Sequence, residues 1–401
     1  MKRLMVVGAG EVQLNLIMVA KDLGYYVTVC DMRDGTMAES LSDSYHKINY
    51  MDKEAVLQAA REERIDGIVS NSEPAMMTVA YVAKVMGLPG NSPESVEKLL
   101  SKSKFRELQK SIGIYAPQYY IISTLEELLE KAKSMNYPII IKPNQCSGTR
   151  GTKKIESFDR RLLEDNFQIC KDFSRNQLVT IEEYVEMSSL RVNEADVFVL
   201  DNDFIWDGWV WADRSSDTPM LPMTNIFPMA MPYVVKDEIK NIVNLILKEA
   251  GIKLGEYNVE TYYTPEGKLF VVEINPRQGG NYIPQLIEQH TGVSLTKLLV
   301  STAVDDMSYY KELKDFKREN NYVTLQIVFS KTSGILEDLY IDSSIQRYVR
   351  WVNQVIKPGE QVDKGINAGK VVAYVNLQFD DYWTQHHFTD NIEEYIYPIL
   401  R

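Results

Sequence analysis

The first 31 residues alternate strand, turn, helix and strand patterns, and this alternation restricts the fold more than any other feature of the sequence. An apolar run at Leu4–Val7 precedes a glycine turn at 8–10, a helical pattern follows, and a second apolar run occupies Tyr26–Cys30. A strand, a helix and another strand in this order open a parallel α/β sheet. Similar patterns continue to the turn-rich segment 87–93, so we predict an α/β domain over residues 1–92.

The first turn carries part of a dinucleotide-binding fingerprint. Gly8 and Gly10, with Asp31 about twenty residues further on, match the pattern in which helix N-terminal amides face a pyrophosphate. The third glycine is missing, because Gln13 stands where close packing of helix on strand favours a small residue. We interpret the turn as part of a scaffold. An NAD-dependent enzyme is the alternative, and it predicts tight NADH binding, which we do not expect.

The composition and charge exclude several kinds of partner. The 401 residues are 45% hydrophobic and 25% charged, as in folded proteins. A net charge of −12 disfavours nucleic acid and anionic membranes, and no apolar run reaches membrane-spanning length. The N-terminus runs into a strand rather than a signal peptide, and the scattered histidines do not predict zinc. No disulfide framework is visible in Cys30, Cys146 and Cys170, so we expect a reducing cytoplasm.

A second region combines a lysine with a loop of small residues. The apolar run Ile139–Ile141 ends at Lys142, and the segment 144–151 that follows is rich in Ser, Thr and Gly. A lysine at a strand end can hold phosphate, and glycines let backbone amides approach phosphate oxygens. Taken alone, the pattern fits an ordinary hairpin loop equally well. About forty residues after Lys142, the segment Thr180–Val185 has two acidic residues between apolar ones.

The third region predicts a hairpin that carries two carboxylates. Asn258–Tyr263 and Leu269–Ile274 flank a turn, so Glu260 and Glu273 would lie close together across the ladder. Two close carboxylates repel unless a cation lies between them, and oxygen ligands suit Mg²⁺. Asn275 and Arg277 lie in step with Glu273, which adds an amide oxygen and a guanidinium that can bind phosphate or carboxylate. The alternative is an exposed polar face on an edge strand.

The order of these segments resembles the ATP-grasp superfamily, and is most similar to its carboxylate-amine ligases related to biotin carboxylase and the L-amino-acid ligases. The resemblance covers nearly the whole chain. It implies an α/β fold with a Rossmann-like domain over residues 1–92, an ATP-grasp domain over 93–304 with lobes of about 93–180 and 181–304, and a β-rich α+β domain over 305–401. The motifs that carry the resemblance are Lys102, Lys142 with the Ser147–Gly151 loop, Glu182–Val185, Glu260 and Glu273–Arg277.

The resemblance implies how ATP would bind. Lys102 would contact the phosphates, with Lys104 as the alternative if the register differs, and Lys142 would hold phosphate oxygens. The loop that would close over the phosphates contributes Ser147, Gly148 and Gly151.

The resemblance implies that the acidic segment 182–185 would bind the adenine and the ribose. The backbone from Glu182 through Glu183 to Val185 would hydrogen-bond the adenine edge, and the carboxylates would reach the amino group or the ribose. In the family a glycine and another glutamate often follow, whereas Met187–Arg191 follows here, so the ribose contacts stay open.

The predicted hairpin would hold the metal. The resemblance implies that Glu260, Glu273 and Asn275 bind Mg²⁺, with Mn²⁺ as a substitute, and that Arg277 is the catalytic residue. Arg277 would orient the reacting carboxylate or stabilise charge on the transferring phosphoryl group.

The implied activity is an ADP-forming ligase. ATP would phosphorylate a small carboxylate to an acyl phosphate, and an amine would attack it to form an amide or peptide-type C–N bond, releasing phosphate. The partners would be small molecules, and a homodimer stays open. The alternatives are a bicarbonate-using carboxylase of the biotin carboxylase or purine-biosynthesis type, and a non-catalytic nucleotide-binding module.

The remaining patterns indicate secondary structure, but they do not identify a substrate. Trp206–Arg214 reads as a strand and 219–229 as an ordered Met/Pro loop; they fit either an acceptor pocket with Arg214 near a substrate carboxylate, or simple core filling. Val323–Phe329 reads as a strand that opens a small closing domain. The K-P-G turn at 357–359 resembles a biotin carrier, but no lysine stands in a matching hairpin, so we do not predict a carrier.

Overall fold

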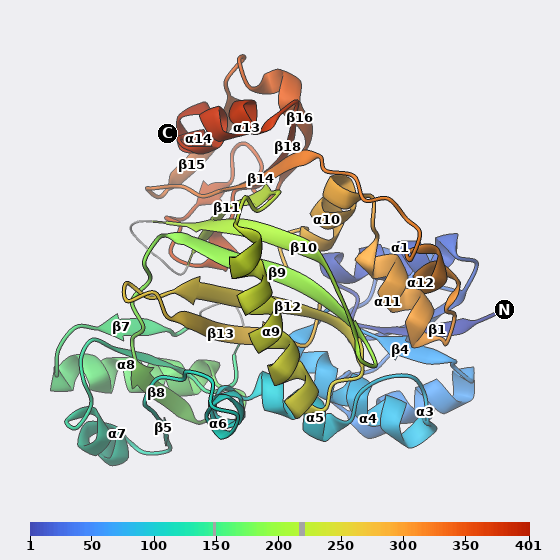
Figure 1. The fold of residues 1–401 in the computed structure, drawn as a ribbon, viewed down its shortest axis with the longest axis horizontal. Coiled ribbons are helices and arrows are strands. Elements are labelled where there is room, and N and C mark those ends of the chain that lie inside the picture. Colours follow the sequence, from blue (N-terminus) through green and yellow to red (C-terminus); the bar gives the residue numbers. More distant parts are fainter. Residues whose placement is uncertain (147–149, 216–220) are drawn as a thin grey trace.

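The computed structural model describes residues 1–146, 150–215 and 221–401. Figure 1 shows a central sheet with the N-terminal domain on one side, a small lobe on the other, and the C-terminal segment beyond one edge. The chain is mixed α/β, as the sequence predicts. Within the described residues, no helix combines the length and apolar character needed to cross a membrane.

The N-terminal domain is the predicted parallel α/β unit. Its sheet has the order β3-β2-β1-β4, with all pairs parallel. The first turn packs tightly because the Gln13 side chain accepts a hydrogen bond from the Gly10 amide at 3.0 Å. The elements are β1 (Arg3–Val7), α1 (Glu11–Asp22), β2 (Tyr26–Asp31), α2 (Met37–Leu41), β3 (Ser44–Lys47), α3 (Lys53–Glu63), β4 (Gly67–Val69), η1 (Glu73–Ala75) and α4 (Met76–Met86).

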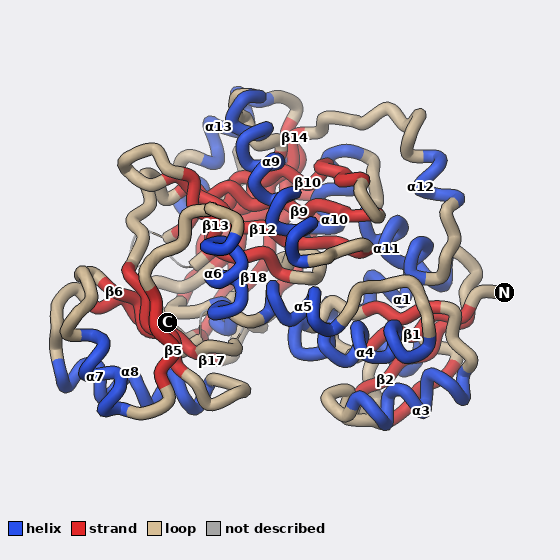
Figure 2. The backbone as a smooth tube through the Cα atoms, turned by 60° about the horizontal axis from the view of Figure 1, so that its bottom comes forward, coloured by secondary structure: helices blue, strands red, loops and turns tan. Residues whose placement is uncertain are grey.

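The small lobe is a separate antiparallel sheet. Its order is β5-β8-β6-β7, and Figure 2 shows it set apart from the N-terminal domain, with two helices beside it. The buried side chains between these helices and the sheet form one apolar cluster that includes Leu128, Ile141 and Leu163. Two helices, α5 (Pro93–Leu100) and α6 (Lys102–Ser111), precede the lobe, and the elements of the lobe are β5 (Tyr119–Ile122), α7 (Leu125–Ala132), β6 (Ile139–Pro143), β7 (Lys153–Ile155), α8 (Arg160–Phe173) and β8 (Val179–Glu183).

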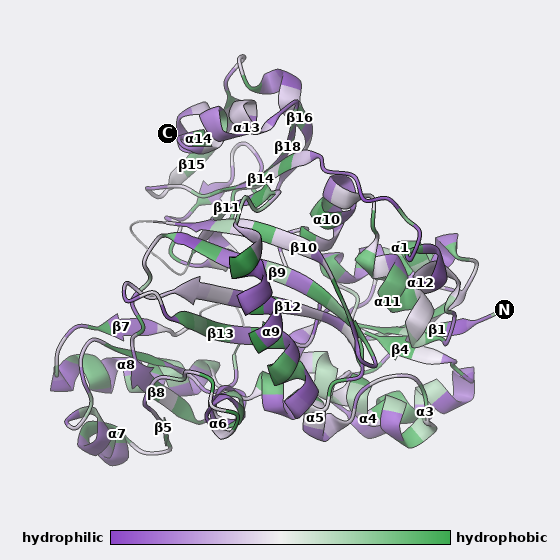
Figure 3. Cartoon of the chain, viewed as in Figure 1, coloured by the Kyte–Doolittle hydropathy of each residue, from purple (hydrophilic) through white to green (hydrophobic). Residues whose placement is uncertain are grey.

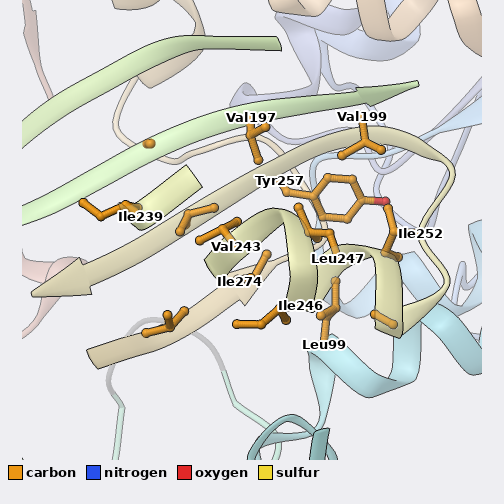
Figure 4. Close-up of a cluster of buried hydrophobic side chains, with 14 of the residues drawn as sticks. Leu99, Val197, Val199, Ile239, Val243, Ile246, Leu247, Ile252, Tyr257 and Ile274 are labelled. Carbon is orange, nitrogen blue, oxygen red and sulfur yellow. The ribbon is translucent and has the colours of Figure 1, made fainter. Parts of the chain in front are cut away.

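The central sheet has eight strands in the order β13-β12-β9-β10-β11-β14-β18-β16. Its apolar face packs on α9, where Val243, Ile246 and Leu247 meet Tyr257 and Ile274 (Figure 4). Figure 3 shows hydrophobic residues recurring along α9 and α11, whereas α7 is largely hydrophilic. The elements are β9 (Arg191–Leu200), β10 (Asp203–Arg214), β11 (Pro222–Phe227), α9 (Tyr233–Ala250), β12 (Leu254–Tyr263), β13 (Leu269–Asn275), α10 (Ile283–Thr291) and α11 (Leu295–Ala303).

The C-terminal segment extends this sheet and adds a smaller one. The strand expected at Val323–Phe329 is present as β14, which pairs with both β11 and β18, and a second sheet has the order β17-β15-β19. The division of the chain at 92 and 304 stays a prediction. The elements are α12 (Ser308–Glu312), β14 (Tyr322–Val328), β15 (Gly334–Ile341), η2 (Gln346–Tyr348), β16 (Val349–Gln354), β17 (Gln361–Val362), η3 (Ala368–Lys370), β18 (Ala373–Phe379), α13 (Tyr382–Thr389), α14 (Ile392–Tyr395) and β19 (Ile396–Leu400).

The Met/Pro run at 219–229 was expected to be a loop, and for most of its length this is wrong. Residues 222–227 form β11, which is paired on both edges, with β10 and with β14. Pro222 stands at the first residue of the strand, where the missing N–H costs little, and the remaining amides are free to join the two ladders. Residues 219 and 220 lie outside the described residues.

Candidate functional site

A solvent-open cleft with a cavity volume of about 310 Å³ lies between the small lobe and the central sheet. One wall of the cleft is formed by helix α6 and by the ends of strands β6 and β8. The other wall is formed by β9, β12 and β13. The predicted residues that the structure brings together along this cleft are Lys102, Lys142, Glu182, Glu183, Val185, Glu260, Glu273, Asn275 and Arg277. Segments far apart in the sequence therefore meet at one place.

Lys142 is held at the cleft wall by a buried charge network. Its ammonium pairs with Glu182 Oε1, and Arg106 Nε donates to Glu182 Oε2 at 3.3 Å. Burial lowers the pKa of Lys142 to about 8 although Glu182 opposes the shift. Burial alone would raise the pKa of Glu182, but Lys142 and Arg106 lower it to about 2. Glu182 is therefore an anion engaged by two cations, and Arg106 is a site residue that the sequence reasoning missed.

The two lysines at the start of α6 have different surroundings. Lys102 lines the cleft and its Nζ donates to the carbonyl of Cys146 at 3.3 Å. Lys104 pairs with Glu97 at 2.7 Å on the outer surface, where nearly half of its side chain is exposed. The structure thus places Lys102, and not Lys104, beside the cleft.

The loop after Lys142 is only partly described. Ser147 and Gly148 lie outside the described residues, so their predicted role stays a prediction. Gly151 has a φ of +71°, which favours glycine, and a Cβ there would lie 3.0 Å from the Phe173 ring. Its carbonyl accepts a hydrogen bond from Cys170 Sγ at 3.0 Å. Gly151 is therefore required for the local backbone.

The acidic segment of β8 is partly engaged within the sheet. The amide of Tyr184 donates to the carbonyl of Pro138 at 2.9 Å, and the carbonyl of Val185 accepts from the Tyr262 hydroxyl at 2.7 Å. The Glu183 carboxylate accepts from Asn136 Nδ2 at 2.9 Å. Glu183, Tyr184 and Val185 all line the cleft, so this segment forms the wall beside Lys142.

The predicted hairpin forms with the predicted register. Glu260 on β12 lies directly opposite Glu273 on β13, as the sequence pattern indicates. Asn275 Nδ2 donates to Glu273 Oε1 at 2.9 Å, so the amide lies on the same side of the strand. Arg277 lines the cleft just beyond, and its Nη1 donates to the carbonyl of Gln278 at 2.7 Å.

The neighbouring strand β9 adds polar groups that the sequence reasoning missed. Glu194 stands opposite Glu260, so three glutamates form one row across β13, β12 and β9. In the next row, Asn258 Nδ2 donates to Asp196 Oδ1 at 2.8 Å and to Glu194 Oε1 at 3.2 Å. The available signal was two acids spaced by two residues, Glu194 and Asp196, because the period of two along a strand points both to one face.

Arg214 ends β10 beside this row. Its Nη2 contacts Glu260 Oε1 at 3.0 Å, and only 7% of its side chain is exposed. Arg214 lines the cleft, and its partner here is a protein carboxylate, so its expected place near a substrate carboxylate stays a prediction.

The row of carboxylates fits a divalent cation. Burial raises the pKa of Glu260 to about 7; Arg214 opposes the shift, and the nearby charges of Glu273 and Glu194 add to it. Carboxylate and amide oxygens are the donor set that Mg²⁺ prefers, and Mg²⁺ commonly uses one or two carboxylates together with substrate phosphates. In the described parts of the chain, no group of three or more His, Cys, Asp or Glu side chains is placed to hold a metal ion, so the row is not a complete metal cage. A cation here would take one or two of the carboxylates and phosphate oxygens as its further ligands.

The raised pKa of Glu260 predicts a pH-dependent stability. Between its ordinary value of 4.5 and about 7, the folded chain keeps a proton that the unfolded chain has released. The free energy of unfolding therefore falls as pH rises through this window. Glu260→Gln has no carboxyl group to titrate at this position. The melting temperature of the metal-free wild type should therefore fall more between about pH 5 and about pH 8 than that of the variant. A larger loss in the variant would contradict the assignment.

The partial dinucleotide fingerprint of the N-terminal domain has an internal explanation. Asp31 Oδ2 accepts from the Ala9 amide at 2.8 Å and from Arg33 Nη2 at 2.7 Å. The Asp31 carboxylate, which would bind a ribose in a dinucleotide site, is thus occupied in joining the glycine turn to the end of β2. This supports the scaffold interpretation of Gly8 and Gly10.

Comparisons with known proteins agree with this layout. Residues 101–204 match the family described as carbamoyl-phosphate synthase L chain, ATP binding domain. The protein y4rH of Sinorhizobium fredii is 24% identical over 77% of this chain and 64% of its own length. An L-arginine-specific L-amino acid ligase of Bacillus subtilis is 24% identical over 63% of this chain and 61% of its own. The chain therefore spans less than two thirds of either curated relative.

Solved structures show the same fold over the whole chain. The L-amino acid ligase from Bacillus licheniformis superposes with a TM-score of 0.83, at 18% identity, covering 100% of this chain and 99% of that one. Together with the matched ATP binding domain, this confirms the resemblance drawn from the motifs.

Proposed function

From the premise that this chain has the ATP-grasp fold and carries the ATP binding domain at residues 101–204, we propose that it is an ATP-dependent, ADP-forming carboxylate-amine ligase. The single observation that carries the proposal is one cleft that brings Lys102 and Lys142 together with a row of glutamates on neighbouring strands. This charge arrangement suits a metal-bound polyphosphate.

The lysines and the β8 segment would bind the nucleotide. Lys102 and Lys142 line the same cleft wall, so both ammonium groups can contact phosphate oxygens. The segment from Glu183 to Val185 is the adjoining wall, where backbone groups would meet the adenine edge. Lys142 would exchange its pairing with Glu182 for contacts with phosphate, leaving Arg106 to hold the carboxylate.

The hairpin side chains that would hold Mg²⁺ or Mn²⁺ are the carboxylates of Glu260 and Glu273 and the amide oxygen of Asn275. When bound, the cation would neutralise charge on the phosphate oxygens. Arg277 would orient the substrate carboxylate, because a planar guanidinium binds a carboxylate by two parallel hydrogen bonds.

The reaction balances without a protein nucleophile. A carboxylate oxygen attacks the γ-phosphorus of ATP, the bond to the β–γ bridging oxygen breaks, and ADP leaves with an acyl phosphate formed. The neutral amine then attacks the acyl carbon, the C–O bond to phosphate breaks, and the nitrogen loses a proton. The role of the chain is to position the reactants and stabilise the developing charge.

The proposal also includes the cellular compartment and the binding partners. Small-molecule carboxylates and amines suit a cleft of this size, and the net charge of −12 makes nucleic acid an unfavourable partner. Three cysteines without a disulfide pattern in the sequence support the cytoplasm, and a homodimer stays open.

A phosphate-release screen tests the proposal. Amino acids and dicarboxylates are supplied in pairs with MgATP, and phosphate and ADP are measured with Glu273→Gln as the control. We expect ADP formation that requires both a carboxylate and an amine. ADP formation that depends on bicarbonate would favour the carboxylase alternative, and MgATP binding without ADP production by any pair would favour the non-catalytic module.

A further inference from the structure

The contact between Arg214 and Glu260 is unusual for a site that is proposed to bind a cation. Glu260 is the middle member of the glutamate row, and one of its oxygens is already engaged by a guanidinium at 3.0 Å. The Arg214 side chain is 7% exposed, so this charge is held inside the cleft wall and not in bulk water.

The two hairpin carboxylates have different contacts. Arg214 Nη2 lies 3.0 Å from Glu260 Oε1, whereas Glu273 Oε1 accepts a hydrogen bond from Asn275 Nδ2 at 2.9 Å. Among the described residues, the cation within ion-pair distance of Glu260 is therefore Arg214.

The backbone of Arg214 is fixed by the sheet. The Arg214 amide donates to the carbonyl of Leu190 at 2.8 Å, and the residue ends β10 at the point where the ladder with β11 shifts register. Arg214 is also one of the residues that line the open cleft. Because the strand holds the backbone, loss of the contact with Glu260 requires a change of the Arg214 side-chain rotamer.

We propose that Arg214 is a built-in counter-ion of Glu260 that competes with the divalent cation and is released into the cleft when the metal binds. The inference rests on the proposed function, because it takes Glu260 as a metal ligand. A divalent cation shared by Glu260 and Glu273 would repel the adjacent guanidinium, which weakens the contact between Arg214 and Glu260. Metal loading thereby converts a paired arginine into one that is available to an anionic group of a substrate.

Metal binding measured by calorimetry tests the competition. Mn²⁺ is titrated into the full-length protein with and without ADP, for wild type, Arg214→Met and Arg191→Met. Because Arg214→Met removes a competing close ion pair, it should tighten Mn²⁺ binding by about tenfold. Arg191→Met removes one positive charge that pairs with Asp213 outside the glutamate row, so it should tighten Mn²⁺ binding much less. Equal tightening in both variants would show a general charge effect and overturn the inference.

Arginine labelling tests the release directly. A dicarbonyl reagent that modifies arginine is applied to the wild-type protein with and without Mn²⁺ and ADP, and modified peptides are measured by mass spectrometry. We expect Arg214 labelling to rise several-fold on loading. Arg191 pairs with Asp213 through two contacts, Nε to Oδ1 at 2.6 Å and Nη2 to Oδ2 at 2.9 Å, outside the metal row, so its labelling should stay constant. Unchanged or reduced Arg214 labelling would overturn the inference.

Failure of this inference is distinguishable from failure of the proposed function. If wild type binds neither Mn²⁺ nor ADP, the proposed function and the inference fall together. If wild type binds both and Arg214→Met binds Mn²⁺ no more tightly, only the inference falls. Should Arg214→Met fold poorly, Arg214→Lys keeps the charge but loses the planar fork, and its Mn²⁺ affinity should exceed that of wild type.

Discussion

Replacing Lys142 with methionine should weaken ATP binding by about ten- to a hundredfold, since a charge-assisted contact contributes about 1.5 to 3 kcal/mol. The methionine side chain fills a similar volume, so the cleft wall keeps its packing while the ammonium is lost. Glu182 would retain Arg106 as its remaining cation at 3.3 Å, which limits the cost in folding stability. The measurement is the Kd for ATP, with melting temperature recorded for the same sample.

Lys153→Met is the matched control for this change. Lys153 lies on β7, the strand next to β6, and its side chain is exposed. The two substitutions remove the same charge from the same small lobe, so a general electrostatic effect would appear in both. An ATP affinity that falls equally in both variants would remove Lys142 from the nucleotide site.

Glu273→Gln should lower ADP formation by about a thousandfold, the upper range for losing one electrostatic stabiliser of a transition state. The amide keeps the shape and can still contact Asn275, but it removes one of the two hairpin charges that would hold Mg²⁺. ADP should still bind through the opposite wall of the cleft. Turnover and the Mg²⁺ concentration for half-maximal rate are the quantities to measure.

Glu266→Gln provides the control within the same hairpin. Glu266 lies in the exposed turn between β12 and β13, away from the cleft. Its substitution removes the same charge with the same chemistry and should leave turnover unchanged. Full activity in Glu273→Gln would show that the metal assignment is wrong.

Local patterns predicted the parts of the site that lie on one hairpin. The opposition of Glu260 and Glu273 follows from the period of two along each strand and from the short turn that joins the strands. The strand that ends at Lys142 and the glycine turn of the N-terminal domain were predictable for the same reason. In each case the relevant neighbours lie within about twenty residues in the sequence, where spacing and turn chemistry decide the geometry.

The missed residues depend on strand order, which local spacing does not encode. Glu194 reaches the site only because β9 pairs between β12 and β10, and the pairing of Glu194 with Glu260 spans 66 positions of the sequence numbering. Arg106 was overlooked because a helical arginine normally faces water, whereas here α6 turns it toward Glu182. The Met/Pro run became β11 because two partner strands were available, a tertiary effect that outweighs composition.

The strand order β11-β14-β18-β16 has a practical consequence for protein engineering. A chain cut near residue 304 would leave β11 with an unpaired edge and would uncover the completely buried Phe227. Such an edge invites pairing with other chains. Chimeras that exchange this part of the sheet between relatives therefore need to transplant β11, β14 and β18 as one block, and a shortened fragment is a poor choice for crystallisation or ligand screening.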